Sequence, residues 1–161
     1  MDFLTATARS SVEIFDIPTV TTVCVKANGW QMSKLEELFD TGFSSLATAV
    51  QPAGPAYALF TRQPSDTVDI EIGFPTSTAL IAPIPAQKVT LEPGEIPAGK
   101  VASLSHIGAF DKLPQAYEEL LAQVEQQGMT PKLPFFEVYV TEPSPEMDPA
   151  DLRTDIFTYV E

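Results

Sequence analysis

One strand-like segment near the C-terminal end carries a charged residue among apolar ones. Residues 133–140 read LPFFEVYV, with Glu137 in the middle. Burying an isolated carboxylate is costly, so such a group is normally paired, protonated or placed for a ligand. In an extended segment alternate side chains share a face, which places Phe135, Glu137 and Tyr139 together. A carboxylate between two aromatic rings is typical of a site for an organic cation, because each ring face adds about 0.5 to 2 kcal/mol.

Two simpler interpretations of Glu137 stay open. The carboxylate could pair with one of the nine Lys and Arg residues, or face water on the open side of an antiparallel sheet. Other reactive residues are few. With one histidine, His106, and one cysteine, Cys24, a metal site that needs two such ligands is excluded, and we expect no cofactor. A Cys24–His106 dyad is conceivable, but a buried thiol and a structural hydrogen bond in the H-x-G turn are favoured.

The composition excludes several classes of function. The formal net charge is −13, with 22 acidic residues, and such a surface repels nucleic acids and anionic membranes. We therefore expect a cationic small molecule as ligand, and no direct contact with nucleic acid or membrane. The single cysteine, the lack of a secretory leader and the lack of a long apolar stretch predict a cytoplasmic protein. The oligomeric state stays open.

The chain contains an internal repeat with an offset of 79 residues. The identical pairs are Glu13 and Glu92, Pro18 and Pro97, Gly29 and Gly108, Pro55 and Pro134, Pro64 and Pro143, and Ser65 and Ser144. Beyond Ser144 the second copy gains about seven residues, so that DIEIGF (69–74) matches DIFTYV (155–160). The repeat predicts one domain, residues 1–161, made of unit one (about 11–74) and unit two (about 89–161).

Each unit has a readable pattern of secondary structure. Segments rich in β-branched and aromatic residues predict strands at 11–18, 19–29, 56–61, 67–74, 99–108, 135–140 and 153–160. An S-x-x-E capping box at Ser33 and Glu36 predicts the start of a helix that ends near Gln51. A second helix begins near Asp111 and stops at Gly128. The proline-rich residues 74–87 predict a strand-like connector.

A duplicated strand-helix-strand-strand unit predicts an α+β fold. We expect a mainly antiparallel sheet with pseudo-two-fold symmetry, both helices packed on it, and a ligand cleft between the halves. The repeat also sharpens the interpretation of Glu137, because Ala58 is its equivalent and Phe60 is the equivalent of Tyr139. A residue needed only for folding is expected in both copies, so a charge in one copy favours a functional role.

Three segments resemble the GyrI-like family of bacterial effector-binding domains. They are residues 95–108, 106–128 and 133–161, and the most specific parts are the run H-x-G-x-F-x-x-L-P and the closing E-x-Y and L-R-T-D-I series. The resemblance implies a duplicated strand-helix-strand-strand fold and a pocket for small molecules, in several members lipophilic cations and drugs. Family members occur alone or attached to DNA-binding regulators. This chain has no helix-turn-helix pattern, so we expect the stand-alone form.

The resemblance also implies roles for individual residues. Glu137 is the pocket acid, with Tyr139 beside it. Phe110 stands where many relatives have Tyr, so a hydroxyl group is missing there. Trp30 has an alternative place in the core. The candidates for the aromatic wall of the pocket are Trp30, Tyr57, Phe110 and Phe135.

Three functions follow as hypotheses. The first, which we favour, is a non-enzymatic protein that senses or sequesters amphipathic organic cations in an aromatic cleft around Glu137. The second is a hydrolase that opens the cyclopropane rings of genotoxic compounds, as some stand-alone relatives do, with Glu137 as the catalytic residue. The third is a modulator that binds a protein partner, because the family also includes inhibitors of DNA gyrase.

Overall fold

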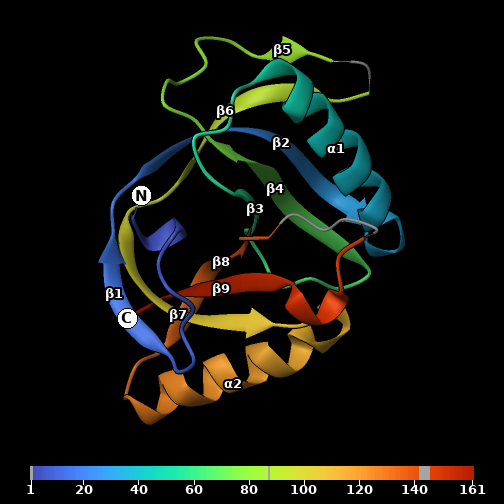
Figure 1. Cartoon of the computed structure of the whole chain (residues 1–161). Coiled ribbons are helices and arrows are strands. Elements are labelled where there is room, and N and C mark those ends of the chain that lie inside the picture. Colours follow the sequence, from blue (N-terminus) through green and yellow to red (C-terminus); the bar gives the residue numbers. More distant parts are fainter. Residues whose placement is uncertain (1, 87, 142–145) are drawn as a thin grey trace.

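The computed structural model describes residues 2–86, 88–141 and 146–161, and within them the chain forms nine strands and two α-helices (Figure 1). The helices are α1 (Leu35–Ala49) and α2 (Leu113–Gln126). The strands of the first part are β1 (Glu13–Ile17), β2 (Val20–Gln31), β3 (Ala56–Phe60), β4 (Thr67–Pro75) and β5 (Ile84–Pro85). Those of the second part are β6 (Thr90–Ile96), β7 (Gly99–Ile107), β8 (Pro131–Tyr139) and β9 (Arg153–Val160).

The strand order reveals the duplication. In the antiparallel sheet the order is β1-β7-β9-β8-β3-β4-β2-β6-β5, with β8 and β3 at the centre. On either side of this centre, β9 corresponds to β4, β7 to β2 and β1 to β6. The first strand of each unit has crossed to the other unit, because β1 pairs with β7 and β6 pairs with β2. The α+β, mainly antiparallel fold predicted from the sequence is confirmed, with its two halves interlocked through these exchanged strands.

Both helices cover the same face of the sheet. Ala58 pairs with Ile72 and with Glu137, and Glu137 pairs with Ile156, so these four side chains share one face. Ile72 belongs to the buried cluster under α1, and Ile156 to the buried cluster under α2. The two helices therefore cover this face at different places, α1 over the first half of the sheet and α2 over the second, toward the upper right and the bottom of Figure 1.

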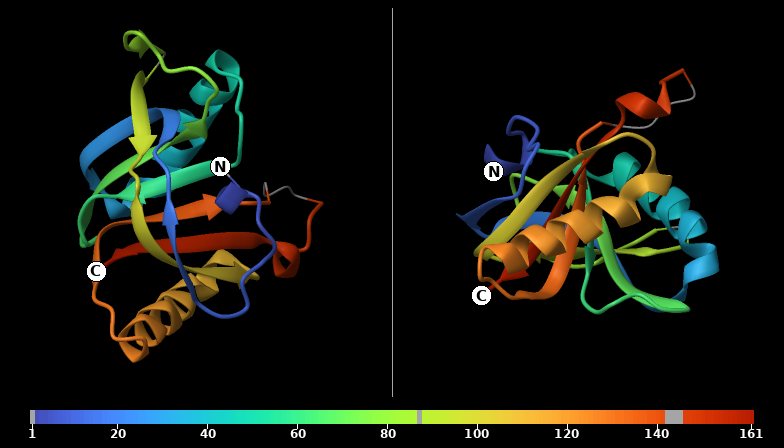
Figure 2. Two further views of the ribbon diagram at one scale, coloured as in Figure 1. Left: turned by 90° about the vertical axis from the view of Figure 1, so that its left-hand side faces the viewer. Right: turned by 90° about the horizontal axis from the view of Figure 1, so that it is seen from below.

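The opposite face of the central strands is covered by the N-terminal segment. Phe3 and Leu4 are buried against Tyr57 and Phe157 in a third apolar cluster. In the right-hand view of Figure 2, the N-terminal end lies on the left and α1 on the right. This segment thus lies on the face of the sheet that carries no helix.

The helix boundaries differ in part from those that the sequence predicts. The capping box is wrong, because Ser33 lies inside a 3₁₀ turn (Met32–Lys34), and the N-cap position of α1, Lys34, makes no side-chain cap. Within such a turn Ser33 lacks the extended backbone that an N-cap needs. At the end of α2, in contrast, Gly128 has the predicted left-handed conformation, with φ of 75°.

The first strand of the second unit and the connector before it differ from what the sequence predicts. The strand β6 contains Pro93 and Gly94, both poor strand formers, and so was not predicted. In the connector 74–87, only residues 74–75 and 84–85 belong to strands, and residue 87 lies outside the described residues. The connector is therefore mostly irregular.

The observed register corrects the alignment of the last strand of each unit. β3 and β8 are equivalent at the 79-residue offset, and the register follows from the pairs Ala58–Ile72 and Glu137–Ile156. Ile72 is thus equivalent to Ile156, and Glu71 to Asp155. The sequence comparison, which placed Asp69 over Asp155, was two residues out, because the second copy gains five residues rather than seven.

No helix in the described part of the chain is long and apolar enough to cross a membrane. Among the same residues, no group of three His, Cys, Asp or Glu side chains is placed to hold a metal ion.

Candidate functional site

A large cavity lies between the two helices, above the central strands β3 and β8. Its volume is about 1880 Å³, more than the roughly 300–1,000 Å³ of a typical ligand pocket, so a small ligand fills only part of it. Because α1 and β3 belong to the first unit and α2 and β8 to the second, the cavity lies where the two halves meet. The apolar and aromatic side chains that line it include Leu35, Phe39 and Phe43 of α1, Leu113, Tyr117 and Leu121 of α2, and Phe60, Phe74, Phe110, Phe135 and Tyr139.

Glu137 lies on the floor of this cavity, next to the pseudo-two-fold axis. Its partner in the adjacent strand is Ala58, its own equivalent in the first unit. The Tyr139 hydroxyl donates to Oε1 at 2.8 Å, and the Tyr117 hydroxyl donates to Oε2 at 2.8 Å. Among the described residues, no ion pair joins Glu137 to a Lys or Arg. The carboxylate is held by two neutral donors and, within the part of the chain that the structure describes, has no basic partner.

The surroundings of Glu137 change its acidity. Burial raises the pKa of Glu137 above its ordinary value, and the hydrogen bonds from Tyr139 and Tyr117 offset part of that rise. Burial and the nearby carboxylate raise the pKa of both tyrosines well above the ordinary value. Both hydroxyls therefore stay protonated and keep donating. Glu137 can act as a carboxylate that attracts a cation or, protonated, as an acid at the cavity floor.

Aromatic rings form the floor around the carboxylate. Phe135 stacks on Phe60, with ring centroids 4.8 Å apart and an angle of 11° between the rings. Tyr117 meets the Phe135 ring edge-on at 5.6 Å. These contacts fix the rings beside Glu137 without covering it, since all of these residues line the cavity.

Further rings form the wall. Phe110, which is 42% exposed, meets Tyr139 edge-on at 6.2 Å. Phe39 of α1 also meets the Tyr139 ring, with centroids 6.1 Å apart. Phe43 in turn contacts Phe39 and Phe74, each at 5.6 Å. Both helices thus bring aromatic surface to the same space.

The charged residues of the lining are mostly acidic. Glu36 and Asp40 of α1 join Glu137, whereas Lys132 is the basic residue among them. The cavity therefore has an excess of negative charge, which favours a cationic ligand over an anionic one.

The structure brings four of the six predicted site residues together. Glu137, Tyr139, Phe110 and Phe135 all line the interhelical cavity. Tyr57 does not, because it is buried on the opposite face, where its hydroxyl donates to Glu71 and lies 2.8 Å from Thr22 Oγ1.

Trp30 is also absent from the lining. It packs at the edge of the buried cluster under α1, and its indole N–H donates to the Lys34 carbonyl oxygen at 2.8 Å. The core position, which the sequence left as an alternative for Trp30, agrees with this packing.

Sequence reasoning missed Tyr117. The residue was assigned to the apolar stripe of the second helix, and it does face the sheet. The available signal was its hydroxyl group, because a tyrosine on a buried stripe needs a hydrogen-bond partner, and Glu137 is that partner.

The histidine and the cysteine have separate structural roles. His106 Nε2 lies 2.8 Å from the Ala109 carbonyl oxygen, which confirms the structural hydrogen bond predicted for the H-x-G turn. Cys24 is fully buried on β2, and burial raises the pKa of its thiol. A buried, protonated thiol is a poor nucleophile.

Comparisons with known proteins agree with the fold and with the family that the sequence resembles. The family model of the GyrI-like small molecule binding domain matches residues 26–161. No curated protein sequence matches the chain.

Several solved structures share the fold. The C-terminal domain of EcmrR is 18% identical, with a TM-score of 0.75, over 94% of this chain and 97% of that one. EcmrR in a complex with DNA is 20% identical, with a TM-score of 0.73, over 94% of this chain, which spans 57% of the EcmrR chain. At these identities the likeness shows a common fold.

Two further solved structures carry information on ligands or activity in their own right. SAV2435 bound to tetraphenylphosphonium is 16% identical, with a TM-score of 0.63, over 94% of each chain. A hydrolase from Listeria innocua is 12% identical, with a TM-score of 0.63, over 98% of this chain and 95% of that one.

Proposed function

The chain belongs to the GyrI-like family of small molecule binding domains, and from this premise we propose that it binds amphipathic organic cations in the interhelical cavity. Glu137 supplies the negative charge, and Phe135, Phe110 and Tyr139 supply apolar contact. One observation carries the proposal: a carboxylate held by two tyrosine hydroxyls, without a basic partner among the described residues, faces an aromatic cavity. Binding of this kind serves sensing or sequestration.

Physical chemistry favours a bulky, delocalised cation in such a site. A small hydrated ion loses much hydration energy on entering an apolar cavity, whereas an organic cation also gains contact with the rings. The raised pKa of Glu137 makes this binding depend on pH, because a cation binds the carboxylate form, which burial disfavours. The relative that binds tetraphenylphosphonium, a lipophilic cation, supports this ligand class.

Binding of tetraphenylphosphonium tests the proposal directly. We expect the full chain to bind this cation, measured by calorimetry at pH 8, at least tenfold more tightly than neutral triphenylphosphine oxide. Glu137→Gln should remove most of that preference, because the amide keeps hydrogen bonds to the tyrosines but carries no charge. Glu118→Gln is the matched control, since Glu118 is exposed on α2 and lies outside the cavity lining. Equal affinity for the cation in Glu137→Gln and the unchanged chain would refute the proposal.

A second candidate function, hydrolysis, has support in the same geometry. A carboxyl group with a raised pKa, beside two hydroxyl donors in a large cavity, is suited to move a proton or orient water. The relative from Listeria innocua described as a hydrolase supports this alternative. Product formation from a cyclopropane-containing substrate, lost in Glu137→Gln, would establish it. Tight cation binding without turnover would exclude hydrolysis of that substrate and support the binding function.

A further inference from the structure

A second, smaller cavity lies on the opposite face of the sheet, against β2, β4 and β6. Its volume is about 570 Å³, and its lining comprises Lys26, Leu59, Thr61, Glu71, Pro93, Gly94, Glu95, Pro97, Leu133 and Pro134. Glu71 is partly buried there, and Oε2 accepts a hydrogen bond from the Tyr57 hydroxyl. Burial raises the pKa of Glu71, and Tyr57, Lys26 and Cys24 offset part of that rise. Among the described residues, no ion pair reaches this carboxylate.

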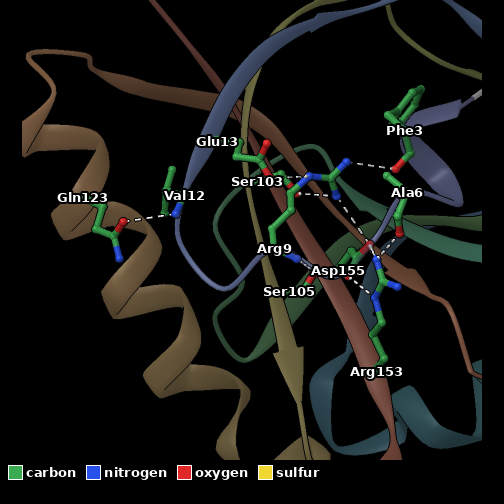
Figure 3. A network of polar contacts seen from close by, with 10 residues as sticks. All are labelled: Phe3, Ala6, Arg9, Val12, Glu13, Ser103, Ser105, Gln123, Arg153 and Asp155. Carbon is green, nitrogen blue, oxygen red and sulfur yellow. Dashed lines mark hydrogen bonds and ion pairs between the residues drawn. The ribbon is translucent and has the colours of Figure 1, made fainter.

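The equivalent place in the other half is filled by the N-terminal segment. There Arg9, which is 5% exposed, inserts its guanidinium next to the fully buried Asp155, with Nη1 at 3.5 Å from Oδ2 (Figure 3). The same nitrogen donates to Ser103 Oγ at 3.4 Å, and Nη2 donates to the Phe3 carbonyl oxygen at 3.2 Å. The guanidinium also lies 4.9 Å from the centre of the Phe15 ring.

The cavity and the binding place of Arg9 are built from equivalent positions. Three contacts of Arg9 are Asp155, Ser105 and Phe15. All three have equivalents in the lining of the cavity, and the pairs are Asp155 and Glu71, Ser105 and Lys26, and Phe15 and Gly94.

The acidic groups are retained in the first half, but the bound cation is not. Asp155 has Glu71 as its equivalent, and Glu13, which forms an ion pair with Arg9 at 3.6 Å, has Glu92. Of these two, Glu71 lines the cavity, together with Glu95 and Lys26, so the cavity presents the central carboxylate of an arginine site without the arginine.

The neighbouring charges increase the difference. In the second half Arg153 also binds Asp155, with Nη2 at 2.8 Å from Oδ2. The residue equivalent to Arg153 is Asp69, whose own partner is Arg62 at 3.1 Å. Asp155 thus has two guanidinium partners, whereas Glu71 has a tyrosine hydroxyl.

We propose that the smaller cavity binds the guanidinium group of an arginine side chain carried by an extended peptide, with Glu71 in the role that Asp155 has toward Arg9. Gly94 stands where the other half has Phe15, so no side chain enters the cavity from this position, and a Cβ atom added there would lie 2.6 Å from Cys24 Sγ and 3.1 Å from Glu71 Oε2. A planar guanidinium fits better than an ammonium, because it can donate to a carboxylate with two N–H groups and lie flat against Pro93 and Pro97.

A peptide with the sequence of residues 2–12, DFLTATARSSV, is the probe, because its counterpart in the chain occupies the equivalent place. Titrated into the full chain and followed by amide NMR shifts, it should perturb Glu71 and Gly94. The same peptide with citrulline, the neutral isostere of arginine, should bind at least tenfold more weakly. Acetyl-arginine-amide separates a peptide ligand from a free guanidino compound. If acetyl-arginine-amide bound as tightly as the peptide, the proposal that the ligand is a peptide would be overturned.

Two variants of the cavity complete the test. Glu71→Gln keeps the size of the side chain and should weaken peptide binding at least tenfold. Lys26→Ser copies Ser105 of the occupied half, removes a positive charge, and should strengthen binding about threefold. Glu137→Gln, on the other face, should leave peptide binding unchanged. Glu71→Gln should likewise leave the binding of tetraphenylphosphonium unchanged, so the proposal for each cavity can fail while the other stands. Perturbation confined to the interhelical cavity or to Ser103 would overturn the inference, because the latter reports exchange with the N-terminal segment.

Discussion

The two halves of the sheet share a backbone plan but place their uncompensated carboxylates on opposite faces. In the second half Glu137 faces the helices, and the equivalent position in the first half is Ala58. On the other face the first half holds Glu71 against Tyr57, whereas its equivalent in the second half, Asp155, pairs with Arg9 and Arg153. The two faces thus differ in kind: at the helix face the acid is present in one half, and at the other face both halves keep the acid but only one binds it to arginines.

The location of Glu137 at the axis explains why the charge occurs once. Ala58 and Glu137 are direct cross-strand neighbours, and such pairs have Cα atoms about 4.5 to 5.5 Å apart. A symmetric pair of glutamates would place two buried carboxylates side by side, and like charges directly opposite each other are destabilising. One carboxylate on the axis serves a cavity that both helices share.

The largest expected effect distinguishes the compensated carboxylate from the uncompensated one. Asp155→Asn removes the buried carboxylate that pairs with Arg9 and Arg153 and leaves Arg9 its exposed partner Glu13, so we expect the free energy of unfolding to fall by about 3–5 kcal/mol. Glu71→Gln, at the equivalent position, removes no ion pair seen among the described residues and should cost less than about 1 kcal/mol. Urea unfolding of both variants checks this, and similar losses would show that the two positions do not differ as the contacts indicate.

A glutamate at position 58 tests the role of the axis. Ala58→Glu should destabilise the chain more than the matched Ala58→Gln, by about 2 kcal/mol at pH 7, because only the glutamate adds a charge opposite Glu137. The gap should shrink at pH 4, where carboxyl groups become protonated. Thermal unfolding of both variants at the two pH values measures it, and a gap that stays constant with pH would rule out charge repulsion.

Much of the fold follows from local pattern in the sequence. The seven predicted strands all exist, because their β-branched and aromatic side chains suit a pleated, half-buried surface. The exchange of β1 and β6 between units could not be predicted, since pairing partners distant in sequence leave no local mark. Pro93 and Gly94 hid β6, and a 3₁₀ turn displaced the start of α1 past Ser33.

The part of the site that lies on β8 was predictable, because side chains alternate between the two faces of a strand. The same rule that joins Phe135, Glu137 and Tyr139 would also have corrected Tyr57, because Ala58 is the equivalent of Glu137 and its neighbour must face the other way. What alternation along one strand does not give is the placement of the helices. The contributions of Phe39 and Tyr117 depend on that placement, and so they became visible only in the structure.

The protonation of Glu137 should make the stability of the chain depend on pH. Because burial raises the folded-state pKa above the unfolded value of about 4.3, the folded chain binds more protons between the two values. The contribution of Glu137 to the free energy of unfolding therefore falls as the pH rises through this window and is constant above it.

The variant Glu137→Gln does not lose this stability as the pH rises, because its amide does not titrate. Relative to the unchanged chain it should gain about 1.4 kcal/mol of stability across the window for each unit of raised pKa. Urea unfolding from pH 4 to pH 8 measures the gain, and the exposed Glu118→Gln should show a flat difference. A gain for Glu137→Gln that falls with pH would mean that the folded state prefers the carboxylate.

The smallest expected effect comes from removing one tyrosine hydroxyl from Glu137, compared with removing one from Glu71. Tyr139→Phe removes one donor to Glu137, a hydrogen bond worth about 0.5 to 1.5 kcal/mol, and so raises the pKa of that carboxyl group further. The affinity for tetraphenylphosphonium grows with pH until Glu137 is ionised, so the plateau should move upward by up to about one pH unit. Tyr57→Phe removes the donor to Glu71 on the other face and should leave the curve in place. Dissociation constants between pH 5 and 9 decide the matter, because an equal displacement in both variants would mean that the two faces are coupled.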